Sequence, residues 1–187
     1  MQIEGDEEAL FMVDSNVLLS GLYYSSRKDT PPHKIINLIK LIVKRKIDIS
    51  LKLFFPKIQL DELIEVVKRK IDSPYDRLLL EEFFKLLYDI SDDISTEELL
   101  RTKKFVENVL KKYCLNGKKA ACDFDPDDIY IISAALSANV RYFITGDKKI
   151  HSAFCRKNDM PACINKLTIL YPSVFVKLVK EMIQPNY

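Results

Sequence analysis

Apolar residues along this chain recur with two different spacings, and the two spacings alternate along the sequence. Short apolar runs predict strands at residues 10–13, 49–53, 142–144 and 167–170. Elsewhere, apolar residues three and four positions apart predict helices that begin near Thr30, Pro56, Asp125 and Pro172. Strands that alternate with helices are typical of a parallel sheet, so the pattern predicts an α/β fold.

One long stretch, from residue 73 to about residue 117, departs from this alternation and is helical throughout. Ser73 and Ser95 stand as N-caps, and Ser95 opens a capping-box string. Each of the two predicted helices has one apolar face, which predicts that they pack together as an inserted helical hairpin. Because this core is too small to fold alone, we expect a single domain over residues 1–187 with a helical excursion at about 73–117.

Composition and charge narrow the class of protein only a little. The chain has 187 residues and a formal net charge of +2, so an argument for a polyanionic partner has to come from local clusters. The first residues are acidic, and Lys or Arg interrupts the longest apolar runs before they reach the length that a bilayer needs. We therefore expect a cytoplasmic protein without a signal peptide or a membrane span.

The cysteines give little sign of a metal site. The chain has two histidines and no CxxC pair, and its cysteines are Cys114, Cys122, Cys155 and Cys163. A structural zinc site is therefore not expected, and free thiols are the first interpretation. The equal spacing within the pairs 114–122 and 155–163 leaves two local disulfides as an alternative if the host is a thermophile.

Acidic side chains stand where predicted strands end and within predicted helices. Asp14 directly follows the first strand, and Ser15 and Asn16 after it are able to orient it or to cap the next segment. Asp147 follows a later strand, and Glu62 lies beside apolar positions in the middle of a helix. Each acid alone is explained as a cap, a turn residue or an exposed helical acid. Together they indicate a site, because ligands of open α/β sheets bind outside the carboxyl ends of the strands.

A further group of acids opens the helix that begins at Asp125. Asp125 is a good N-cap and Pro126 suits the first helical position, while Asp127 and Asp128 stand in the first turn, where the helix dipole favours negative charge. The rest of this helix is nearly all apolar or small. We therefore expect it to lie mostly buried, with its acids at one end.

Four motifs that carry these acids resemble the PIN domain: MVDSNVLLSG, LDELIEVV, DPDDIYIISAAL and YFITGDKKI. The closing string ILYPSVFVKLV is similar to the last strand and helix of that family, so the resemblance covers most of the chain outside about 73–117. It implies a three-layer α/β/α sandwich around a parallel sheet. It also implies a metal-dependent nuclease that usually acts on RNA.

The resemblance carries over residue by residue. The positions that match the family's acids, and are implied to be catalytic and metal-binding, are Asp14, Glu62, Asp128 and Asp147. Glu62 is either a ligand or the acceptor that orients the water, and Asp127 remains an alternative to Asp128. Asn16 and Thr145 match the polar residues that support these acids.

The chemistry implied for this set is that of a hard divalent cation. Mg²⁺ and Mn²⁺ prefer oxygen ligands, and crowded carboxylates repel one another unless a cation neutralises them. The number of ions, one or two, stays open. Lys148 and Lys149 directly follow Asp147, so they are the expected contacts for nucleic-acid phosphates.

We therefore predict a metal-dependent endoribonuclease, with a role either as a toxin or in RNA processing and decay. The expected partners are single-stranded RNA, an antitoxin or another protein, and further copies of the chain. A non-catalytic PIN-like scaffold that binds RNA or protein is the main alternative. A phosphoryl-transfer protein of the receiver type ranks lower, because it requires an acidic pair at the first strand and a lysine on a late strand.

Overall fold

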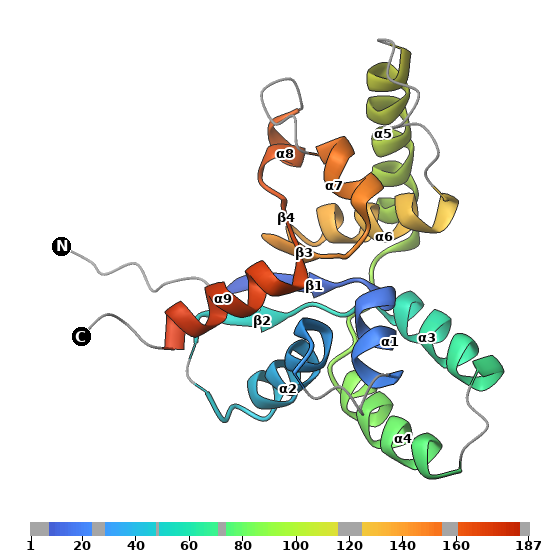
Figure 1. Ribbon diagram of the computed structural model, residues 1–187. Helices are drawn as coiled ribbons and strands as arrows, with labels where there is room; N and C mark the ends of the chain where they lie inside the picture. Colours follow the sequence, from blue (N-terminus) through green and yellow to red (C-terminus); the bar gives the residue numbers. More distant parts are fainter. Residues whose placement is uncertain are drawn as a thin grey trace.

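The computed structural model of the protein describes residues 8–23, 29–47, 49–70, 74–115, 125–154 and 161–183. Within these ranges, four parallel strands form one sheet in the order β2-β1-β3-β4 (Figure 1). The strands are β1 (Ala9–Val13), β2 (Leu51–Leu53), β3 (Tyr142–Ile144) and β4 (Thr168–Leu170). The predicted α/β fold with a parallel sheet is confirmed.

Helices surround the sheet, and most begin where the sequence predicts. They are α1 (Ser15–Tyr23), α2 (Pro31–Val43), α3 (Lys57–Lys70), α4 (Pro74–Tyr88), α5 (Thr96–Leu115), α6 (Pro126–Ser137), α7 (Lys148–Phe154), α8 (Ala162–Asn165) and α9 (Pro172–Ile183). Asp125 caps α6, because its Oδ1 accepts a hydrogen bond of 3.1 Å from the Asp127 N–H. No helix in the described ranges is long and apolar enough to cross a membrane.

The two faces of the sheet bury separate apolar cores. Along β1, Phe11 and Val13 point into the first core and Met12 points into the second, as the alternation of a strand requires. Helices α1, α2, α3, α4 and α9 cover the first core, and α5, α6, α7 and α8 cover the second (Figure 1). The chain is thus a three-layer α/β/α sandwich, as the resemblance implied.

The helical stretch between the second and third strands packs differently from the expected hairpin. In α4, Phe83 and Leu87 belong to the first core, whereas Val106 and Val109 of α5 belong to the second. The turn between them runs past the end of β2, where the Asp92 N–H donates to the Phe55 carbonyl at 3.0 Å. The two helices therefore lie on opposite faces of the sheet, and α5 packs mainly against α6.

His151, expected in a loop, lies in α7, a short helix whose inward residues are Ile150, His151, Ala153 and Phe154. A run of this length is too short to show helical periodicity in the sequence. Ser73, Cys122 and Cys155 lie outside the described residues, as do the side chains of Cys114 and Cys163. The N-cap at Ser73 and the state of the cysteines therefore remain predictions.

The strand order also determines where a site can form. After β1 the chain builds β2 on one side of it, and β3 later pairs with its other side. The strand order thus reverses at β1, and a crevice opens at such a point outside the carboxyl ends of the strands. Asp14 follows β1 and Asp147 follows β3 closely, so both acids stand at this crevice.

Candidate active site

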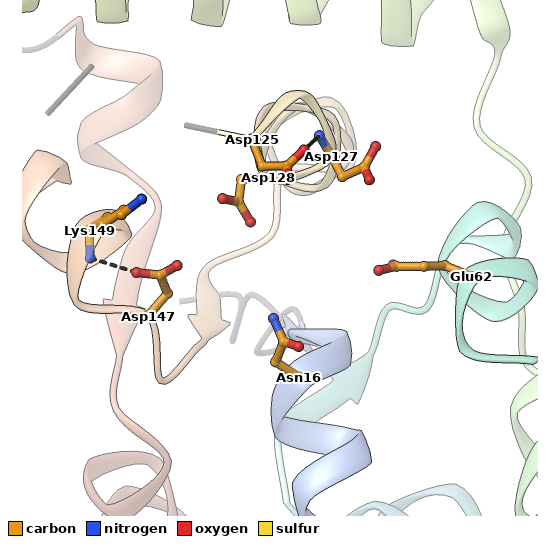
Figure 2. A pocket seen from close by; sticks show the side chains of 7 residues that line it. All are labelled: Asn16, Glu62, Asp125, Asp127, Asp128, Asp147 and Lys149. Atoms are coloured by element: carbon orange, nitrogen blue, oxygen red, sulfur yellow. Dashed lines mark hydrogen bonds between the residues drawn. The ribbon is translucent and has the colours of Figure 1, made fainter. Parts of the chain in front are cut away.

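A polar pocket of about 510 Å³ opens beyond the carboxyl ends of β1 and β3 (Figure 2). The residues that line it are Asn16, Glu62, Asp125, Asp127, Asp128, Asp147 and Lys149. A smaller recess shares several of these residues and also reaches Asp14. The acids singled out in the sequence therefore gather around one cleft, although they come from four separate segments.

Asp14 is the most deeply buried of these acids, with 8% of its surface exposed. Its Oδ2 accepts a hydrogen bond of 2.6 Å from the Thr145 hydroxyl, and its Oδ1 accepts one of 3.1 Å from the Asn16 N–H. The Thr145 oxygen in turn accepts from the Asp147 N–H at 3.0 Å. Thr145 therefore links the two acids that follow β1 and β3, whereas Asn16 supports Asp14 through its backbone.

Glu62 reaches the pocket from α3, on the side opposite Asp147 (Figure 2). Its Oε2 accepts a hydrogen bond of 2.8 Å from the hydroxyl of Ser15, which is 4% exposed. Ser15 was expected to orient Asp14 or to cap the next segment, but its side chain orients Glu62. The sequence places a hydroxyl next to Asp14 without indicating that its partner lies on another helix.

The first turn of α6 supplies two acids that line the pocket, and they lie near different neighbours. Asp128 points toward the side of Asp147, and Asp127 toward the side of Glu62 (Figure 2). The neighbouring charges agree with this view: besides burial, Asp14 raises the pKa of both Asp128 and Glu62, but Asp147 acts on Asp128 and Asp127 acts on Glu62. Asp128 is thus the acid of this turn that lies on the side of Asp147.

Three of the carboxyl groups are harder to ionise than usual. Burial is the main cause for each of them, and it raises the pKa of Asp128 from 3.8 to about 6. Burial likewise raises the pKa of Asp14 and of Glu62, although hydrogen bonds from Thr145 and Ser15 act in the opposite direction. Neighbouring negative charges add to each increase. Crowded acids of this kind repel one another, so the pocket favours a cation.

The side chains around the pocket offer the kind of ligand atoms that a hard divalent ion prefers. The acids around the pocket offer carboxylate oxygens, which Mg²⁺ and Mn²⁺ prefer. Among the described residues, however, no three carboxylate, imidazole or thiol side chains stand close enough to hold one ion together. Coordination by Asp14, Asp128 and Asp147 would therefore require their side chains to turn inward from the pocket wall.

The two lysines that follow Asp147 differ in position. Lys149 lines the pocket, and its backbone N–H donates a hydrogen bond of 2.6 Å to Asp147 Oδ1. Lys148 is exposed and is not among the residues that line the pocket. Of the pair, Lys149 is therefore the one that stands beside the acids.

Two residues behind the site were not assigned a role from the sequence. His151 is 8% exposed, lies 2.9 Å from the Thr145 carbonyl through Nε2, and stacks on Tyr171 with ring centroids 3.5 Å apart. Gln59 is fully buried, and its Nε2 donates to the Val13 carbonyl, one residue before Asp14. No periodic signal marks either residue, because each acts through a partner distant in the sequence or through the backbone.

The chain is therefore an α/β protein with a parallel sheet and an acidic pocket at the point where the strand order reverses. A family model described as the PIN domain matches residues 11–149, from within β1 to the start of α7. The chain belongs to the PIN domain family, whose members are typically nucleases that use divalent metal ions. No curated protein and no solved structure gave a match.

Proposed function

We propose that the protein is an endoribonuclease that cleaves phosphodiester bonds of RNA at the acidic pocket, with Mg²⁺ or Mn²⁺ as cofactor. One observation carries the proposal: Asp14, Glu62, Asp128 and Asp147 come from separate segments yet surround one cleft. A merely structural role for these acids would leave their repulsion uncompensated. Membership of the PIN domain family supplies the reaction class.

In this proposal Asp14, Asp128 and Asp147 hold the cation. When bound, a divalent ion makes a water molecule acidic enough to ionise near neutral pH and offsets the negative charge of the phosphodiester. Thr145 fixes the orientation of the Asp14 carboxylate through its 2.6 Å hydrogen bond. Asp127 lines the same pocket but stands nearer Glu62, so we assign the ligand role to Asp128.

Glu62 has a separate task, because it faces the other acids from α3. Its pKa is raised, mainly by burial, which suits a carboxylate that accepts a proton from the attacking water. The Ser15 hydroxyl bonds one carboxylate oxygen of Glu62 and leaves the second oxygen available for that water. Glu62 is therefore assigned to orient and deprotonate the nucleophile.

The substrate is a polyanion that has to approach a cluster of acids. Lys149 lines the same pocket and is placed to meet a phosphate next to the one that is cleaved. Single-stranded RNA suits an open pocket better than a duplex, because its backbone can bend into the cleft. A toxin and an RNA-processing enzyme would both use this reaction, and the proposed protein partners are an antitoxin or another protein and further copies of the chain.

The decisive experiment is cleavage of a circular single-stranded RNA, which has no ends and so reports only internal cuts. We expect linear products with Mn²⁺ or Mg²⁺ and none with EDTA. Asp14→Asn and Asp128→Asn should each lower the rate by about 100-fold or more, in line with the loss of a group that acts in the transition state. The matched control is Asp61→Asn, since Asp61 is exposed on α3 and lies outside the pocket.

The outcomes separate the two functions under consideration. Unchanged cleavage by Asp14→Asn would contradict the assigned site. RNA binding without any metal-dependent cleavage by the unaltered protein would contradict the nuclease and favour a non-catalytic scaffold.

A further inference from the structure

We propose that Gln59 is a positioning residue that, together with Ser15, docks α3 on the end of β1 and so sets Glu62 opposite Asp14. The inference rests on the proposed function of Glu62. It concerns a buried side chain that lines neither the pocket nor the recess, and so cannot touch the substrate.

Gln59 compensates for a backbone donor that is missing at Pro56. On the β2 side of β1, the Phe54 N–H donates to the Phe11 carbonyl at 2.8 Å. The next step of this parallel ladder would use the N–H of residue 56 to reach the Val13 carbonyl, but Pro56 has no N–H. The Gln59 side chain fills this position, because its Nε2 donates to the Val13 carbonyl at 2.5 Å. A side chain of α3 thus replaces a backbone donor of the sheet.

Burial of Gln59 costs more free energy than burial of an apolar side chain of similar size. It has no exposed surface, and its Oε1 is buried without a hydrogen-bond partner among the described residues. An amide buried with an unsatisfied acceptor costs free energy that Met or Leu of similar size would not. What Gln59 offers in return is the directed hydrogen bond to the last carbonyl of β1.

A second contact of α3, between Glu62 and Ser15, lies on the other side of Asp14 in the sequence. Gln59 and Glu62 are three positions apart, so they lie on the same side of α3. Gln59 bonds the residue before Asp14, and Glu62 bonds the residue after it, Ser15. Two contacts on consecutive turns fix both the rotation and the translation of α3 relative to Asp14, which one contact would leave free.

This arrangement has a consequence for the reaction. Figure 2 shows Glu62 on the far side of the pocket from Asp147, so any shift of α3 changes how far Glu62 reaches into the cleft. Displacement of a reacting group by about 1 Å can lower a rate by up to about 100-fold. Loss of the Gln59 amide should therefore lower kcat through Glu62, while substrate binding, assigned above to Lys149 and the cation, is little changed.

The test is a double-mutant cycle on the full-length protein with single-stranded RNA and Mn²⁺. Gln59→Met keeps the size of the side chain and removes the donor, and it is made alone and together with Glu62→Gln. We expect kcat to fall about tenfold in the Glu62 background with KM within about twofold, and to fall less than about twofold when Glu62 is already Gln. Ile58→Met, at an exposed position one residue away on α3, is the control.

A measurement without metal separates positioning from stability. In EDTA, the thermal midpoint should change by the same amount when Gln59→Met is added to either background, because the lost hydrogen bond is the same. The second arm is Ser15→Ala, which should lower kcat, and Ser15→Thr, which keeps the hydroxyl and should restore most of it.

Three results would overturn the inference. An equal loss of kcat in both Glu62 backgrounds would show that Gln59 acts only on stability. An unchanged kcat in Gln59→Met would show that α3 is held without it. Absence of metal-dependent cleavage by the unaltered protein would instead contradict the proposed function itself, and the inference with it.

Discussion

The hydroxyl of Thr145 donates a hydrogen bond of 2.6 Å to Asp14 Oδ2, although 131 positions separate the two residues in the sequence. Thr145 is fully buried and also accepts from the Asp147 N–H. Burial raises the pKa of Asp14, and the hydrogen bond from Thr145 opposes that increase. One hydroxyl group thus offsets part of the rise in the pKa of a buried acid and joins the ends of two neighbouring strands.

Replacement of Thr145 by Val should therefore lower the stability of the protein. The change keeps the shape of the side chain but leaves a buried Asp14 oxygen without its donor, at a cost of about 1–3 kcal/mol. Thr145→Ser keeps the hydroxyl and should behave almost as the unaltered protein does. Urea denaturation at pH 8 measures the difference, and equal midpoints for the Val and Ser variants would contradict this role.

The Asp128 carboxyl group predicts a pH dependence of the metal-free protein. Its pKa is raised from 3.8 to about 6 by burial and by neighbouring acids, so the folded state binds this proton more tightly than the unfolded chain does. The group favours folding below its ordinary pKa, and that contribution is lost as the pH rises through about 6. The thermal midpoint of the unaltered protein in EDTA should therefore fall relative to that of Asp128→Asn between pH 4 and pH 7. A constant difference between the two would show that the pKa of Asp128 is not raised.

For Asp14→Asn, activity should be lost without a loss of stability. Loss of one carboxylate relieves repulsion in the metal-free site, so the midpoint in EDTA should stay or rise while metal-dependent cleavage disappears. Addition of Mn²⁺ at about 100 times its Kd should stabilise the unaltered protein by about 2.7 kcal/mol and leave the variant nearly unchanged. If Asp14 were only a helix cap, Asn would replace it well, and both properties would persist.

The helices α4 and α5 should not fold without the sheet. Because each buries its apolar face in a different core, a peptide of residues 73–117 lacks a partner for either face. We therefore propose that residues 1–187 behave as one domain, and we expect the peptide to show little helix by circular dichroism. Cooperative thermal unfolding of the isolated peptide would count against a single domain.

The sequence predicted those features that depend on neighbouring residues. The strand that ends at Asp14, the cap at Asp125 and the strand that precedes Thr145 all follow from local chemistry and spacing. The partners of α4 and α5 did not follow, because an apolar helical face does not specify which of two apolar surfaces covers it. The turn at Asp92 determines which core each helix joins, because it pairs with the segment just after β2 and leads the chain from one face of the sheet to the other.

The supporting contacts of the site were harder still to predict. Ser15 stands beside Asp14 yet bonds Glu62, 47 positions away, and Gln59 acts on a backbone carbonyl. Such contacts depend on how α3 lies against β1, which no periodicity records. Acids at strand ends can therefore be identified from sequence, whereas the side chains that orient them require the folded arrangement.

The strand order also determines when each edge of β1 can pair during synthesis. β1 ends at Val13 and its partner β3 begins only at Tyr142, so the second edge of the central strand cannot pair until residues 142–144 have been synthesised. Long-range pairings of this kind form slowly because a long loop has to close first. A ribosome-bound chain halted before residue 142 should thus be readily digested by protease and inert toward RNA. In the proposed nuclease, the acids of the site therefore come together only after Asp147 has been synthesised.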